Sequence, residues 1–280
     1  MKYSTGVKEL DDLLSGGYES RIVTQFYGPT KSGKTTLAAY TPIGQVYKYY
    51  KESKGGIPSN HKFFVVDGDG GFDHDRAEQV WRGMQLTEED IEEIRKNLLY
   101  WQPTSFGEQH TIIMKEIPSI IEPSTSKDKK KQTAQPMYPL LLVADPLIAE
   151  YRGHVLTTPR RFKMVVVGES TGKLDREIIK LRQLAVKYGC PAIITSWPGS
   201  DVGKMMKTED GKLPPASEQN MIGGRAFGFI PKTIIELQIP VKGLPLRRAV
   251  IEKHRAKPEG LSCQFRLTDR GVESFEASGS

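Results

Sequence analysis

The chain has 280 residues, 40 Lys and Arg against 34 Asp and Glu, and two cysteines. No apolar run approaches the ~20 residues of a membrane-spanning helix, and no hydrophobic stretch follows Met1 as it would in a signal peptide. We therefore expect a cytoplasmic, nucleoid-associated protein with no role in a membrane. Cys190 and Cys263 predict neither a metal cluster nor a disulfide. The net charge of +6 favours an anionic partner such as nucleic acid if the basic residues cluster.

The first predicted elements are a short helix and a phosphate loop. Apolar residues at helical spacing within residues 4–20 predict the helix. Residues 28–35, GPTKSGKT, match the pattern G-x-x-x-x-G-K-[ST] of the phosphate loop, or Walker A motif. A β-prone run precedes the pattern and a helical run follows it. Gly28 and Gly33 let the backbone turn so that successive N–H groups face one anion. The sequence therefore predicts nucleotide binding.

This loop assigns roles to its side chains. Lys34 is expected to reach the β- and γ-phosphates, and the Thr35 hydroxyl to bind Mg²⁺. The predicted nucleotide-binding residues of the loop are Gly28, Pro29, Thr30, Lys31, Ser32, Gly33, Lys34, Thr35 and Thr36.

Two predicted buried strands, residues 61–67 and 140–145, end in carboxylates. In open α/β sheets, ligands bind at the carboxyl ends of the strands. Asp145 therefore has the position of the strand-terminal aspartate that holds the Mg²⁺ water shell beside a phosphate loop. Asp69 follows the first of these strands and adds a second acidic group at the same edge.

The rest of the chain alternates between helical and extended patterns. Helices are predicted at 35–51, 76–84, 87–98, 110–121 and 174–188, strands at 98–101, 192–197, 233–239 and 249–252, and a closing hairpin at 263–272. Residues 168–173, GESTGK, predict an ordinary turn, because their glycine spacing is one residue short for a phosphate loop. We expect a flexible insertion at 122–139 and a mobile loop at 198–224. The pattern predicts a single α/β domain, residues 1–280, with a mostly parallel central sheet.

In this order the motifs resemble those of the RecA-fold recombinases, most closely archaeal RadA and its paralogues such as RadB. Besides the phosphate loop, the matching segments are STGVKELDDLLSGG at 4–17, AEYRG at 149–153, MIGG at 221–224, KPEG at 257–260 and TDRG at 268–271. The resemblance implies a RecA-like ATPase core with a C-terminal β-hairpin, ATP and Mg²⁺ as cofactors, and a role in homologous recombination and DNA repair. It also implies single- or double-stranded DNA and a RadA-type recombinase or another repair protein as partners. The core begins near Met1, without the family's N-terminal helical domain, so we expect a paralogue that does not form filaments by itself; a homo-oligomer is left open.

The chain departs from the family at three site positions. Asp69 replaces the glutamate that polarises the attacking water, and the adenine-stacking arginine falls at Asp73, with Arg76 nearby. The γ-phosphate sensor falls at Trp197. Because small positional errors can slow a reaction by ~10²-fold, we expect weak hydrolysis with Lys34, Asp69 and Asp145 as its catalytic residues, and a slow DNA-dependent ATPase at most.

The resemblance also implies three groups of basic residues. Lys253 and Arg255 match a pair that, in KaiC-type relatives, reaches a neighbouring subunit's γ-phosphate; surface charge is an equally good interpretation. The two DNA-binding loops of the family correspond here to basic groups at Arg152, Arg160, Arg161 and Lys163 and at Lys204, Lys207, Lys212 and Arg225. Two alternatives stay open: an inactive scaffold for a recombinase or nuclease, and a KaiC-like signalling ATPase without a DNA role.

Overall fold

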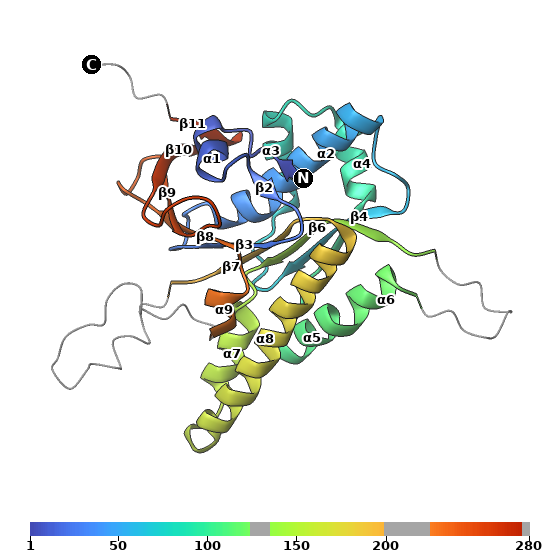
Figure 1. Cartoon of the computed structure of the whole chain (residues 1–280). Coiled ribbons are helices and arrows are strands. Elements are labelled where there is room, and N and C mark those ends of the chain that lie inside the picture. Colours follow the sequence, from blue (N-terminus) through green and yellow to red (C-terminus); the bar gives the residue numbers. More distant parts are fainter. Residues whose placement is uncertain (124–134, 199–224, 276–280) are drawn as a thin grey trace, which may run out of the picture.

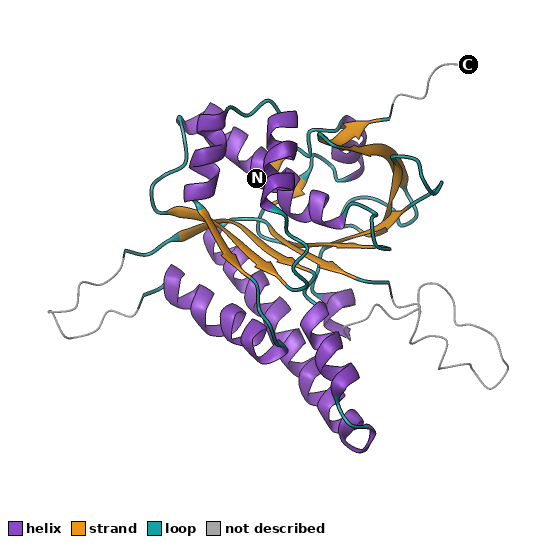
Figure 2. Cartoon of the chain, turned by 180° about the vertical axis from the view of Figure 1, so that it is seen from behind, coloured by secondary structure: helices purple, strands orange, loops and turns teal. Residues whose placement is uncertain are grey.

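The computed structural model describes residues 1–123, 135–198 and 225–275, and within them a large sheet carries helices on both faces (Figures 1 and 2). Its strand order is β11-β10-β9-β8-β3-β7-β6-β4-β5. The strands are β3 Val23–Tyr27, β4 His61–Asp67, β5 Leu98–Trp101, β6 Tyr138–Asp145, β7 Ala192–Ser196, β8 Thr233–Gln238, β9 Leu246–Lys253, β10 Ser262–Thr268 and β11 Gly271–Ser274. Six neighbouring strands, β8, β3, β7, β6, β4 and β5, run parallel to one another. The remaining strands, β9, β10 and β11, are added antiparallel at the β8 side. The predicted α/β class and mostly parallel sheet are confirmed.

The helices form two layers, α1 to α4 on one face of the sheet and α5 to α9 on the other (Figure 1). The first layer contains α1 Lys8–Leu13, a π-helical turn η1 Thr36–Tyr40, α2 Thr41–Lys54, α3 His74–Gly83 and α4 Glu88–Lys96. The second contains α5 Phe106–Thr111, a π-helical turn η2 Ile112–Glu116, α6 Ile117–Ile121, α7 Ala149–Thr157, a 3₁₀ turn η3 Arg160–Phe162, α8 Lys163–Tyr188 and α9 Arg225–Phe229. A separate two-stranded sheet pairs β1 Lys2–Tyr3 with β2 Tyr18–Glu19. None of the helices in the described ranges has the length and apolar content needed to cross a bilayer.

The sheet separates two hydrophobic cores. In β4, Phe63 and Val65 pack in the core under the first helical layer, while Phe64 and Val66 pack in the core under the second. Successive side chains of a strand point to opposite faces, so a strand covered on both sides is apolar at every position. This explains why β4 and β6 are nearly continuous apolar runs.

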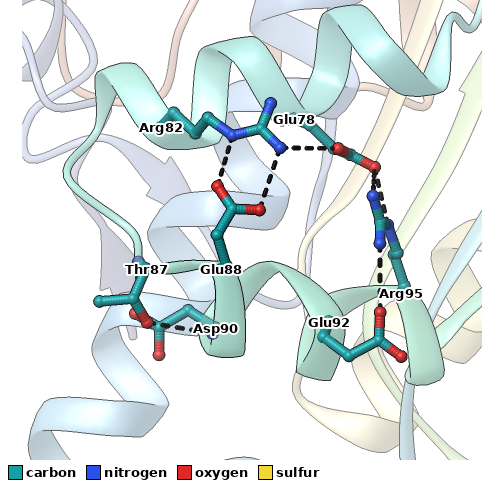
Figure 3. Close-up of polar contacts among 7 residues, drawn as sticks. All are labelled: Glu78, Arg82, Thr87, Glu88, Asp90, Glu92 and Arg95. Carbon is teal, nitrogen blue, oxygen red and sulfur yellow. Dashed lines mark hydrogen bonds and ion pairs between the residues drawn. The ribbon is translucent and has the colours of Figure 1, made fainter.

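Helices α3 and α4 are joined by an ion-pair network (Figure 3). Arg82 bridges Glu78 and Glu88, and Arg95 pairs with Glu78 and Glu92. Isolated surface pairs contribute little, but a network fixes the relative orientation of its helices.

A capping box opens α4, with Thr87 and Asp90 bonded reciprocally. The ion pairs tie α4 to α3, and α3 is tied in turn to η1, because Trp81 Nε1 donates to the Tyr40 carbonyl oxygen at 2.9 Å.

The turn predicted at 168–173 is wrong, because these residues lie inside α8. Ser170, Leu174 and Ile178 continue one buried stripe at four-residue spacing. Gly168 and Gly172 lie on the open side, where an added Cβ would meet nothing within 4 Å. Packing of the stripe therefore overrides the low helix propensity of glycine.

Residues 149–173 form what we call the α7–α8 arm, which projects away from the sheet (Figure 1). The predicted insertion at 122–139 and loop at 198–224 lie mostly outside the described residues.

Candidate nucleotide-binding site

The phosphate loop joins β3 to η1 at the carboxyl edge of the sheet. Gly28 has φ +155°, and a Cβ added there would lie 2.3 Å from the Leu237 carbonyl oxygen of β8. Gly33 has φ +94°, and its added Cβ would lie 3.2 Å from a methyl carbon of Leu267 on β10. Gly28 is thus required by backbone angle and by space, whereas Gly33 is required mainly by its backbone angle. The loop is tied to the C-terminal strands once more, because Arg247 Nε donates to the Lys31 carbonyl oxygen at 3.1 Å.

Lys34 and Ser32 offer donors inside this loop. Lys34 Nζ donates to the carbonyl oxygens of Gly28 and Pro29, each at 2.9 Å. Burial lowers the pKa of Lys34, while the nearby carboxylates of Asp145 and Asp69 act in the opposite direction. The Ser32 hydroxyl is buried and has no hydrogen-bond partner among the described residues. A partly desolvated ammonium and an unpaired hydroxyl suit a bound phosphate.

Asp145 ends β6 and is almost completely buried. Burial raises its pKa to about 6, and hydrogen bonds from the Thr195 and Thr35 hydroxyls oppose this shift. Thr195 Oγ1 donates directly to Asp145 Oδ1. Sequence reasoning missed Thr195, which follows Ile194, the β7 residue paired with Ala144 of β6. A hydroxyl at the end of a predicted strand was visible in the sequence, but its neighbour depends on the strand order.

These residues fit Mg²⁺ bound together with a nucleotide. In the described ranges no group of three or more His, Cys, Asp or Glu side chains is arranged to hold a metal. Mg²⁺ needs no such cage, because it typically takes one or two protein oxygens, substrate phosphates and waters. The Thr35 hydroxyl and the Asp145 carboxylate are the two protein groups that such a site requires.

The two acidic groups after β4 have different surroundings. The Asp67 carboxylate accepts hydrogen bonds from the backbone N–H groups of Gly71 and Phe72, both at 3.0 Å, and from the Tyr100 hydroxyl at 2.8 Å. Asp67 thus shapes the loop. Asp69 accepts from Gly71 N at 3.1 Å, and its pKa is raised by desolvation and by the charge of Asp67, against the attraction of Lys34. Asp69 is therefore the better placed of the two to act near Lys34.

Asp73 and Arg76 have structural partners. The Asp73 side chain caps α3 by accepting from Arg76 N at 2.9 Å. The Arg76 guanidinium donates to the carbonyl oxygens of Thr268 and Asp269, both at 2.6 Å. Arg76 thus ties α3 to the turn between β10 and β11, and its contact with adenine stays a prediction.

Lys253 and Arg255, the predicted trans-acting pair, both have partners within the chain. Lys253 Nζ donates to the carbonyl oxygens of Gly228 at 2.8 Å and Phe229 at 3.2 Å, in α9. Arg255 pairs with Glu19 of β2. Their action on a neighbouring subunit stays a prediction, and it requires these contacts to exchange.

The first predicted DNA-binding group lies on the α7–α8 arm, and most of the second lies outside the described residues. Arg160, Arg161 and Lys163 are exposed at the end of the α7–α8 arm. Arg152 lies at the root of the arm, its guanidinium carbon 5.5 Å from the centroid of the Trp197 ring. Arg225 opens α9. The remaining predicted residues lie outside the described ranges: Lys204, Lys207 and Lys212.

Fold and loop together define a phosphate-loop nucleotide-binding protein with a RecA-like core. The family model for Rad51 matches residues 1–275. The chain therefore belongs to the Rad51 family.

Among curated relatives, the DNA repair and recombination protein RadB of Thermococcus kodakarensis is 32% identical over 274 residues, 98% of this chain and 99% of that protein. RadB of Thermococcus gammatolerans is 30% identical over 271 residues, 96% of this chain and 97% of that protein. A solved structure, the crystal structure of the RadB recombinase, superposes with a TM-score of 0.66 at 28% identity, and the match covers 98% of this chain and 100% of that one. The predicted resemblance to RadA paralogues of the RadB type is confirmed.

Proposed function

We propose that this chain is an ATP-binding, Mg²⁺-dependent RadA paralogue of archaeal type that binds DNA inside the cell and modulates homologous recombination and repair. Its curated relatives are named DNA repair and recombination proteins, which supports a role in recombination and repair. The observation that carries the ATP-binding part is the phosphate loop, in which partly desolvated Lys34 faces the carboxylates of Asp69 and Asp145.

In this proposal each group of the site has one task. Lys34, the Ser32 hydroxyl and the backbone N–H groups of the loop bind the phosphates, and Thr35 and Asp145 hold Mg²⁺, which would neutralise phosphate charge when bound. Asp69 orients and deprotonates the attacking water. Because aspartate is one methylene shorter than glutamate, hydrolysis is slow. The nucleotide then serves regulation or assembly more than rapid turnover.

The proposed DNA-binding surface consists of the α7–α8 arm and the loop predicted at 198–224. Exposed Arg160, Arg161 and Lys163 bind backbone phosphates without reading sequence. A RadA-type recombinase or another repair protein is the protein partner, and Lys253 and Arg255 complete a neighbour's site if the chain assembles with itself.

The test combines nucleotide and DNA binding. Wild type is expected to bind ATP with Mg²⁺ and to bind DNA in a salt-sensitive way. Lys34→Ala should lose at least about 30-fold in ATP affinity, because it removes a desolvated charge from the phosphates. Lys8→Ala, an exposed lysine of α1, is the matched control and should bind ATP as wild type does. Equal ATP affinity of the Lys34 variant would remove the site assignment, and absence of DNA binding at low salt would favour the signalling ATPase.

A further inference from the structure

Four half-buried rings from four elements form a line that we call the aromatic row: Tyr50 of α2, His61 of β4, Tyr138 of β6 and Tyr188 of α8. Consecutive ring centroids are 6.3, 5.5 and 5.9 Å apart, and neighbouring rings are tilted by 44–50°. A pocket of about 230 Å³ opens among these rings, with Tyr3 and Lys187 in its wall. The row is thus an accessible aromatic surface, partly set into the protein.

The row lies far from the nucleotide-binding edge along the strand direction. His61 and Tyr138 are the first residues of β4 and β6, whereas the phosphate loop follows the last residue of β3. These strands run parallel, so the row and the loop occupy opposite edges of the sheet. Figure 1 shows β4 and β6 between α2 on one face of the sheet and α8 on the other. None of its residues is used by the proposed ATP site or by the arm.

A lysine stands at each end of the row. Lys54 Nζ lies 5.1 Å from the centroid of the Tyr50 ring, and Lys187 Nζ lies 5.4 Å from that of Tyr188. Burial, followed by the charge of Lys54, lowers the pKa of His61, which favours the uncharged ring. The surface therefore combines uncharged ring faces with terminal cations.

One acidic residue restrains this positive charge. Glu122 Oε1 accepts from Lys187 Nζ and from the Tyr188 hydroxyl, each at 2.5 Å. Hydrogen bonding to these two groups lowers the pKa of Glu122, which is ionised at neutral pH. An anion that approaches Lys187 must compete with this carboxylate.

We propose that the aromatic row binds single-stranded nucleic acid, with bases stacked on its rings and backbone phosphates at Lys54 and Lys187. Rings combined with cations are the features by which proteins bind single strands without reading their sequence. A duplex does not fit, because its bases are already stacked and paired. A free nucleotide shares this chemistry but spans only part of the row. This contact is additional to the DNA surface of the arm and does not depend on the ATP site.

Photo-crosslinking of the full chain to an oligo(dT) that carries 5-iodouracil locates the strand. We expect crosslinked peptides that contain Tyr138, Tyr188 or Tyr50, without added ATP. Crosslinks confined to the arm peptides would overturn the proposal while leaving the proposed arm contact intact. An excess of free dTMP should not displace the oligonucleotide, and displacement would instead indicate a mononucleotide site and overturn it.

Two variants separate stacking from packing. Tyr138→Leu keeps apolar bulk but removes the ring, and should weaken oligo(dT) binding by about 5- to 100-fold. Tyr138→Phe keeps the ring and should stay within about twofold of wild type. Equal binding by both variants, with native circular dichroism, contradicts stacking at this position.

Glu122→Gln provides a test in the opposite direction at an exposed residue. It releases Lys187, so the affinity for oligo(dT) should rise and the slope of log affinity against log salt should steepen by about 0.7, the value for one added phosphate contact on a single strand. Unchanged affinity and slope would show that the lysine does not contact the strand and would count against the proposal.

Discussion

The phosphate loop and the α7–α8 arm use the same residue types under opposite constraints. In the loop, a Cβ on Gly28 would collide with the backbone of β8, and Lys34 is partly desolvated. In the arm, Gly168 and Gly172 have open space around them, and Met164 has 87% of its surface exposed. The loop is therefore specified by backbone geometry and tolerates almost no change. The arm presents charged and apolar side chains to solvent. Its function should therefore survive replacement of its glycines but not of its basic residues.

The largest difference between the two regions should appear when alanine replaces a loop glycine. Gly28→Ala places a methyl group 2.3 Å from a carbonyl oxygen at φ +155°, so the loop must shift. We expect the free energy of unfolding to fall by about 2–4 kcal/mol, measured by urea denaturation, together with loss of ATP binding. A Gly28→Ala protein as stable as wild type would show that the loop is not held rigidly against β8.

The arm should respond to charge instead. Replacing Arg160, Arg161 and Lys163 together by Gln should weaken DNA binding by about tenfold at moderate salt and flatten its salt dependence. ATP affinity should not change, because these residues lie far from the loop. Fluorescence anisotropy over a salt series measures the effect. A uniform loss that is independent of salt would indicate that the arm acts through shape and not through phosphate contacts.

At the nucleotide-binding site, protonation of Asp145 at the end of β6 should have a smaller effect on ATP affinity. With a pKa raised to about 6, this carboxyl is ionised above that pH and protonated below it. Only the ionised form can help to hold Mg²⁺, so the Mg²⁺-dependent part of ATP affinity should fall by about fourfold between pH 7.5 and 5.5. Calorimetric titration at both values measures it. Asp145→Asn should bind more weakly at both values and lose this pH dependence; the same dependence in that variant would place the titrating group elsewhere.

The difference between the regions also explains what the sequence could predict. Gly28, Gly33 and Lys34 form a local pattern, and β4 and β6 are apolar because both their faces are covered, so loop and strands followed from the sequence. Thr195 could not be assigned, since its contact with Asp145 depends on the strand order.

The aromatic row could not be predicted from the sequence either, because it too depends on how the elements are arranged. It gathers residues 50, 61, 138 and 188 only after α2, β4, β6 and α8 are assembled. The turn predicted at 168–173 is wrong for another reason: these residues lie inside α8, where the buried stripe of Ser170, Leu174 and Ile178 outweighs the low helix propensity of the two glycines.

The smallest effect, and the sharpest contrast with Gly28, is expected at Gly172, which lies in α8 outside that stripe. Gly172 lies in the interior of α8, where an added Cβ meets nothing within 4 Å. Gly172→Ala removes backbone freedom from the unfolded chain at no steric cost, so the free energy of unfolding should rise by about 0.5–1 kcal/mol. The same urea experiment measures it, and DNA binding should stay unchanged. If Gly172→Ala were instead as destabilising as Gly28→Ala, α8 would have to bend or pack against another element at Gly172. That result would contradict a continuous helix from 163 to 188 with open space at this glycine.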